Sequence, residues 1–157
     1  MKLNTKANRI LAGCLFTCAI SAIAWATPPL MFSLIPVVGP TAFDEIHTKA
    51  KTDTWECSIK TKGLSDVYMS EIVIAPGGHG GWHSHPGPSF LCVKSGTATF
   101  YDDCNDLTRQ QYPAGTGFVE DANCVHFLAN EGDEELVVVV MQIVEFGAPR
   151  RIDEQAP

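Results

Sequence analysis

The sequence has little basic charge, no Cys-x-x-Cys pair and no long stretch with a helical period. Three of its 11 Lys and Arg residues lie within residues 1–9, so from residue 27 onward 8 basic residues stand against 18 acidic ones, a net charge of −10. Such an acidic chain repels a phosphate backbone, which argues against nucleic acid as a partner. The missing cysteine pair argues against a thiolate zinc site. With 157 residues and 45% hydrophobic composition, the chain suits one compact domain rather than a large multidomain enzyme or a disordered protein.

The N-terminus has the pattern of an export signal over residues 1–26. A basic stretch precedes an apolar run from Ile10 to Trp25, and alanines on both sides of Trp25 mark a cleavage point after Ala26. We therefore expect a periplasmic or secreted protein that touches the membrane only through this signal. Two alternatives stay open. The run is almost long enough to be a retained membrane anchor, and Cys14 lies in a sequence similar to a lipoprotein processing site.

Four cysteines follow the signal, at Cys57, Cys92, Cys104 and Cys124. In an oxidising compartment they allow up to two disulfides, with three connectivities that the sequence does not distinguish. Cys104 lies in a polar turn and Cys124 is close to the start of an expected strand, so we expect these two to pair first. The alternative is that all four are reduced, half-buried thiols.

Short apolar runs bounded by turn residues predict an all-β barrel or sandwich over residues 43–147. The expected strands cover residues 55–61, 67–75, 81–85, 89–94, 97–102, 108–112, 117–120, 125–130 and 135–146. Before them, residues 27–42 are rich in proline without a helical period, which predicts an extended arm. After them, residues 148–157 form a polar tail that we expect to be only partly ordered.

Three of the five histidines lie between residues 79 and 85. Alternate residues of a strand point to the same face, so His83 and His85 would present two imidazoles to one ion. Neutral imidazole binds divalent iron, zinc, manganese, nickel and copper, and a third ligand must come from another strand. His126 is the obvious candidate. The sequence thus predicts one divalent transition-metal ion held by His83, His85 and His126. The alternative is a metal-free barrel whose imidazoles form hydrogen bonds in a polar pocket.

Two further residues are candidates for catalytic roles. Glu120 lies six residues before His126 with the same strand parity, so it would reach the ion or hold one of its ligands. The alternative for Glu120 is an exposed loop carboxylate. His79 lies between two glycine pairs and would be an additional ligand or a proton shuttle, with a solvated loop histidine as the alternative.

The two histidine segments resemble the two motifs of the cupin superfamily. The matching residues are Gly77, His83, His85 and Gly96 in the first motif and Pro113, Gly115, His126 and Asn130 in the second. The second motif departs from the family in lacking a glycine six places before its proline and in having a longer spacer before its histidine. Ser89 stands where the first motif usually has its Glu ligand. Over residues 67–146, the resemblance implies a two-sheet jelly-roll barrel with a three-histidine variant of the metal site.

The resemblance implies a small-molecule ligand without fixing an activity, because one fold hosts many functions. Without the usual Glu, the ion would keep its full positive charge, so we expect the site to favour a small anionic organic molecule. One hypothesis is an enzyme in which the metal ion serves isomerase, lyase or dioxygenase chemistry. A second is a non-catalytic module that binds a metal or small ligand, and a third is a metal-free interaction scaffold. Pairing of barrels is common in the family, so the resemblance also implies a homodimer.

Overall fold

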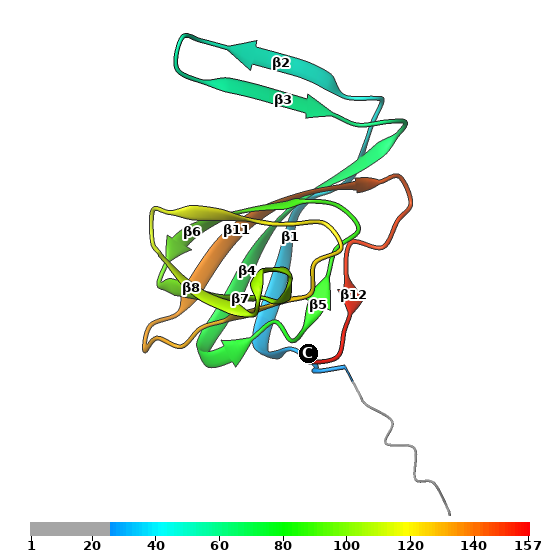
Figure 1. Cartoon of the computed structure of the whole chain (residues 1–157). Helices are drawn as coiled ribbons and strands as arrows, with labels where there is room; N and C mark the ends of the chain where they lie inside the picture. Colours follow the sequence, from blue (N-terminus) through cyan, green and yellow to red (C-terminus); the bar gives the residue numbers. More distant parts are fainter. Residues whose placement is uncertain (1–25) are drawn as a thin grey trace, which may run out of the picture.

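The computed structural model describes residues 26–157, which fold almost entirely into β-strands (Figure 1). In chain order the elements are β1 (Leu30–Phe43), β2 (His47–Lys51), β3 (Glu56–Lys60), β4 (Ser65–His79), β5 (His83–Ser84), β6 (Ser89–Ser95), β7 (Thr97–Asp102), the 3-10 turn η1 (Asp103–Asn105), β8 (Thr108–Pro113), β9 (Gly117–Glu120), β10 (His126–Ala129), β11 (Leu136–Glu145) and β12 (Ile152–Asp153). The predicted signal lies outside the described residues except for Ala26. Within residues 26–157, no helix has the length and apolar character needed to span a bilayer.

One curled sheet of ten strands builds the body of the molecule and nearly closes into a barrel (Figure 1). Its strand order is β12-β5-β10-β4-β11-β6-β9, with β1 also paired to β4 and the β7–β8 pair attached to β10. The long strand β4 is central to this arrangement because it pairs with both β1 and β11 over residues 65–74. The separate β2–β3 hairpin extends away from the barrel (Figure 1). The prediction of an all-β barrel is confirmed.

The N-terminal edge of the barrel differs from the expectation of a separate arm. Most of the expected arm is β1, which pairs antiparallel with β4, for example at Leu34 and Ile72. The prolines of β1 make the segment look unlike a strand in the sequence. They are tolerated because β1 pairs with β4 alone. A proline on such an edge strand loses no hydrogen bond on the side that has no neighbouring strand. The barrel therefore begins at Leu30 rather than at Phe43.

The C-terminal tail is also more ordered than its composition predicts. Ile152 and Asp153 form β12, which pairs antiparallel with β5 (Figure 1). Next to this pair, the Ser84 hydroxyl donates a hydrogen bond of 2.8 Å to Glu154 Oε1. The partner of this strand lies far away in the chain, so local sequence carries no trace of the pairing.

The interior of the barrel changes from apolar to polar along its strands. On β11 the inward side chains pass from Val138 and Val140 to Gln142, and on the neighbouring β6 they pass from Leu91 to Ser89. The apolar part forms one buried cluster of Ile72, Ile74, Leu91, Val93, Ala98, Phe100, Leu128, Leu136, Val138 and Val140. The polar ends of these strands border the candidate site.

Candidate metal centre and cavity

The three predicted histidines lie together inside the barrel. His83 on β5 and His126 on β10 are directly opposed in the antiparallel register, so both side chains point to the same face. Their ring centroids are 4.4 Å apart. The ring of His85 follows two residues after His83 and lies 4.8 Å from His83 and 5.1 Å from His126. All three residues are buried.

Glu120 joins the histidines from the end of β9. Its carboxylate Oε2 lies 3.1 Å from His85 Nε2, and its Oε1 lies 3.5 Å from His126 Nε2. At 3% exposure Glu120 is not an exposed loop carboxylate. Glu120 is the direct cross-strand neighbour of Ser89, the position where the first cupin motif usually has its Glu. The carboxylate that is missing from β6 is thus supplied by the adjacent strand.

Backbone carbonyl groups fix the orientation of each imidazole. Nδ1 lies 2.8 Å from Gly81 O in His83, 2.6 Å from Arg150 O in His85 and 2.9 Å from Cys124 O in His126. A carbonyl oxygen only accepts hydrogen bonds, so each Nδ1 carries the proton and donates it. The Nε2 atoms of the three rings are left with free lone pairs, which is the form that binds a metal ion.

In this arrangement hydrogen-bond acceptors on the imidazoles face acceptors on the carboxylate, with no donor between them. A cation between these atoms would satisfy both sides. The Nε2 lone pairs of His85 and His126 are directed at the carboxylate of Glu120, and buried His126 Nε2 has no hydrogen-bond partner. An unsatisfied buried polar atom is costly unless a proton or metal ion lies between the acceptors. The four ligand atoms lie within 4.8 Å of one another, close to the roughly 4.4 Å that two opposite metal–ligand bonds span. His83, His85, Glu120 and His126 therefore fit a metal ion.

The electrostatics of the site favour the same protonation states. Burial, assisted by the neighbouring His126, lowers the pKa of His83 to about 3. Burial also lowers the pKa of His126. For Glu120, burial acts to raise the pKa, but the nearby His126 and His85 outweigh it and lower the pKa to about 2. At neutral pH an ionised Glu120 carboxylate thus lies beside the neutral imidazoles of His83 and His126, the donor forms that a divalent metal ion requires.

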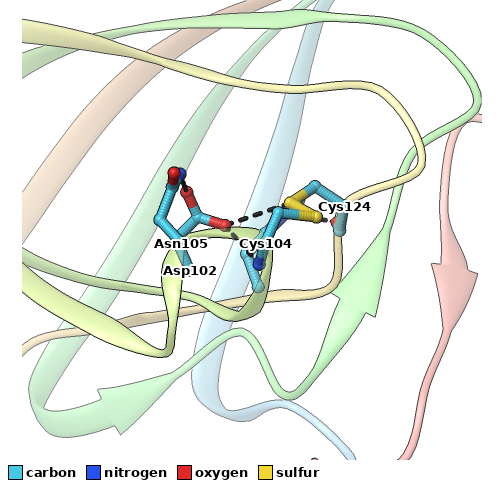
Figure 2. Close-up of a disulfide and its surroundings, with 5 residues drawn as sticks. Asp102, Cys104, Asn105 and Cys124 are labelled. Carbon is cyan, nitrogen blue, oxygen red and sulfur yellow. Dashed lines mark hydrogen bonds between the residues drawn. A yellow bond between two sulfur atoms is a disulfide. The ribbon is translucent and has the colours of Figure 1, made fainter.

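A disulfide anchors the segment that orients His126. Cys104 in η1 is bonded to Cys124, which lies two residues before His126 (Figure 2). This is the pair that the sequence favoured, while Cys57 and Cys92 are free. Asp102 accepts a hydrogen bond from the backbone N–H of Cys104, which holds the turn in place (Figure 2). Because the Cys124 carbonyl accepts from His126, the disulfide supports the imidazole indirectly.

Two other sequence candidates lie outside the cluster of four. His79 Nδ1 accepts a hydrogen bond of 3.2 Å from the Gly81 N–H, and its ring packs 4.8 Å from Phe127. His79 does not line the cavity described below. Asn130 of the second motif is fully buried and donates to the carbonyl oxygens of Ile74 and Glu134, so it fixes the turn after β10.

A cavity of about 280 Å³ opens next to this cluster, of which His83, His85 and Glu120 line it. Its apolar wall comes from β1, β4, β10 and β11, and its remaining polar wall comes from Gln142 on β11 and from the C-terminal segment. The lining residues are Pro29, Phe32, Leu34, Ile72, Gly80, His83, His85, Glu120, Leu128, Val140, Gln142, Arg150 and Arg151. A small organic molecule can thus lie against apolar side chains while one end meets the histidines.

Sequence reasoning missed the two arginines. Arg151 is held by Asp153, at 2.6 Å from Nε to Oδ1, and donates from Nη2 to Gly80 O at 2.8 Å. Arg150 donates from Nη1 to Ser70 Oγ at 3.3 Å, and its guanidinium lies 5.5 Å from the centroid of the Tyr68 ring. The sequence does show two adjacent arginines in a chain with few basic residues. It does not show that they lie beside the histidines in the folded protein.

Comparison with known proteins agrees with this geometry. Residues 70–142 match the family model described as a cupin domain. No curated protein matches the chain. Among solved structures, a cupin-like protein from Thermotoga maritima is 21% identical with a TM-score of 0.50, and the match covers 60% of this chain and 79% of that one.

Two enzymes are also among the similar structures. A DMSP lyase is 19% identical over 57% of this chain with a TM-score of 0.50, and an oxalate oxidase is 28% identical over 51% with a TM-score of 0.45. This chain spans less than half the length of either enzyme, 45% and 46%. These likenesses concern the fold alone. The family match, the fold of the Thermotoga maritima protein and the nearly closed all-β sheet show that this chain contains a small cupin-type domain, a jelly-roll β-barrel.

Proposed function

We propose that this chain is an exported metal-binding cupin whose cavity takes a small anionic organic molecule. In this proposal His83, His85, His126 and Glu120 hold one divalent transition-metal ion. The observation that carries it is the set of Nε2 lone pairs facing a buried carboxylate, with His126 Nε2 unpartnered. Three nitrogen donors and one oxygen donor suit iron, manganese, zinc, nickel or copper.

Glu120 changes the basis of the expected preference for anions. Three histidines alone would leave a divalent ion its full charge, whereas an ionised Glu120 in the same cluster neutralises part of it. The support for an anionic ligand therefore comes mainly from Arg150 in the cavity wall, since Arg151 is paired with Asp153. A bound divalent metal ion would supply a Lewis acid for a ligand carboxylate, enolate or thiolate. The chain itself orients the imidazoles, lines the cavity and provides positive charge beside the ligand.

A non-catalytic binding module is the second candidate function. Apart from the two arginines, which stay charged, the only titratable side chains that line the cavity are Glu120, His83 and His85 of the cluster itself. His79, the other expected acid or base, is outside the cavity lining. Isomerase, lyase or dioxygenase activity would therefore use the metal ion or Glu120 rather than a separate general base.

Export and pairing of chains belong to the same proposal. The Cys104–Cys124 disulfide supports an oxidising compartment, such as a periplasm or the extracellular space. Pairing of two chains stays a prediction. Its support is the position of β1, which pairs with β4 alone and exposes Val37 and Val38.

Elemental analysis of the purified protein tests the metal centre. We expect about one divalent metal ion per chain, and less than about a tenth of that in His126→Gln, because the orphaned Nε2 donor is lost. His79→Gln is the matched control and should keep its metal, since His79 lies outside the cluster. A wild-type protein without stoichiometric metal, or an unchanged metal content in His126→Gln, would refute the proposal.

A further inference from the structure

Arg150 lines the cavity, and its guanidinium group has no carboxylate partner. Arg109 is paired with Glu131, and Arg151 is paired with Asp153. For Arg150, no carboxylate oxygen among residues 26–157 lies within ion-pair distance, and its side chain is held only by the Ser70 hydroxyl and the face of Tyr68. It is thus the one arginine of this part of the chain that lacks an acidic partner.

Burial makes this lack of a partner costly. Arg150 is half-buried, and the loss of water around it lowers its pKa. A guanidinium nevertheless keeps its charge in proteins, so the charge must be compensated by its surroundings. Glu120 contributes only a distant attraction, since it is not in contact with Arg150. The natural counter-ion is an anion that enters the cavity.

The other lining residues and the volume of the cavity indicate the size and polarity of the rest of that ligand. Phe32, Leu34, Ile72, Leu128 and Val140 form an apolar wall. At about 30 Å³ for each water-sized group, a volume of about 280 Å³ has room for roughly ten non-hydrogen atoms. The ligand is therefore a small molecule with an apolar body and one charged end.

The available donors suit a carboxylate. A guanidinium offers two parallel N–H groups that match the two oxygens of a carboxylate. Arg151 adds little charge because Asp153 neutralises it. A single uncompensated positive charge balances a monoanion better than a phosphate dianion.

Arg150 also connects the ligand end of the cavity to the donor cluster. Its carbonyl oxygen lies 2.6 Å from His85 Nδ1 and accepts that proton. One residue thus orients an imidazole through its backbone and presents a cation to the cavity through its side chain. A substitution that removes only the side chain keeps the carbonyl contact, so the two roles can be separated.

We propose that Arg150 determines ligand specificity and that the ligand is a small monocarboxylate with an apolar body. This inference rests on the function proposed above, because the metal centre forms another part of the same cavity. It assigns Arg150 to the ligand carboxylate and not to the metal ion.

The test compares benzoate with benzamide, two probes of nearly equal shape that differ in charge. Binding to the metal-loaded protein is measured by calorimetry for the wild type, Arg150→Gln and Arg150→Lys. We expect the wild type to prefer benzoate by about 10- to 100-fold, as for hydrogen bonds to charged groups. Arg150→Gln should reduce the preference to less than about threefold, and Arg150→Lys should give an intermediate value because it keeps the charge and loses the paired donors.

Controls separate this inference from the proposed metal centre. Arg109→Gln removes an exposed arginine outside the cavity and should keep the wild-type preference. Metal content is measured on every sample, and Arg150→Gln should match the wild type. A full benzoate preference in Arg150→Gln, or in Arg150→Lys if the glutamine variant does not fold, overturns the role of Arg150.

If the wild type contains no metal, the proposed function fails while Arg150 can still be judged. The same two probes are then applied to the metal-free protein. A benzoate preference that Arg150→Gln removes upholds the inference, and equal binding of the two probes by the wild type overturns it.

Discussion

The central segment and the two flanking segments of this chain build different parts of one cavity. Residues 70–142 supply all four residues that could hold a metal ion, His83, His85, Glu120 and His126. The flanks supply Phe32 and Leu34 from β1 and both arginines from the C-terminal segment. The donor set is thus encoded in the part of the chain that matches the family. Much of the wall that would contact a ligand is encoded outside it.

The two parts are joined at one of the donors. His83 and His126 donate to carbonyl groups two residues earlier in the chain, at Gly81 and Cys124. His85 instead donates to Arg150 in the C-terminal flank. We therefore expect changes in the central segment to alter metal binding first. Side-chain changes in the flanks should alter the ligand and leave the metal in place.

The largest expected effect comes from breaking the covalent link inside the central segment. Replacing Cys104 and Cys124 by Ser removes a cross-link between residues 20 apart. The free energy of unfolding should fall by about 3 kcal/mol, because the unfolded chain regains loop entropy. Metal affinity should also fall by about tenfold, since the Cys124 carbonyl that orients His126 is less well fixed. Urea unfolding and metal titration measure the two effects.

The free cysteines provide the matched control for the disulfide. Cys57→Ser and Cys92→Ser change the same atom at positions without a cross-link, so both should stay within about 0.5 kcal/mol of the wild type. If the double variant kept full metal affinity, the disulfide would stabilise the fold without supporting His126.

A smaller change in free energy, about 1.4 to 2.8 kcal/mol, is expected from moving the carboxylate between neighbouring strands. Glu120→Ser should lower metal affinity by about 10- to 100-fold, because it removes a charged donor from the cluster. Adding Ser89→Glu should restore most of the loss. Ser89 and Glu120 are directly opposed on β6 and β9, so the side chains start from nearly the same place on the inner face. Metal titration of the single and double variants measures the recovery.

Exposed Glu56 on the hairpin provides the control for the carboxylate exchange. Glu56→Ser removes a carboxylate of the same type far from the cluster and should leave metal affinity unchanged. If the variant with both changes bound metal no more tightly than Glu120→Ser, a carboxylate at residue 89 would not replace the one at residue 120 as a metal ligand.

The features of the fold and site that depend on local sequence patterns could be predicted from the sequence. Alternating strands and turn residues predicted most of β3 to β11, and strand parity placed His83 and His85 on one face. The pairing of Cys104 with Cys124 followed from their places at strand ends. Glu120 was identified as a candidate through its parity with His126. Its position opposite Ser89 depends on the register between β6 and β9, which no local pattern encodes.

The parts that were missed depend on contacts between distant segments. The prolines of β1 conceal a strand that is stable because β4 lies beside it. The two residues of β12 are too few to show alternation, and they form a strand only against β5. Arg150 reaches the cavity because this C-terminal segment packs against the barrel. The flanks were therefore the least predictable region and also the region that shapes the ligand wall.

The smallest effect should come from trimming the apolar wall in the N-terminal flank. Leu34→Ala removes part of a side chain that lines the cavity and packs against the core. Benzoate affinity should fall roughly fivefold, corresponding to about 1 kcal/mol for the partial loss of apolar contact. Metal content should stay at the wild-type level because β1 holds none of the four donors. Val37→Ala on the same strand is the control, since Val37 is 65% exposed and does not line the cavity. A loss of metal in Leu34→Ala would mean that the N-terminal flank and the donor cluster are not separable.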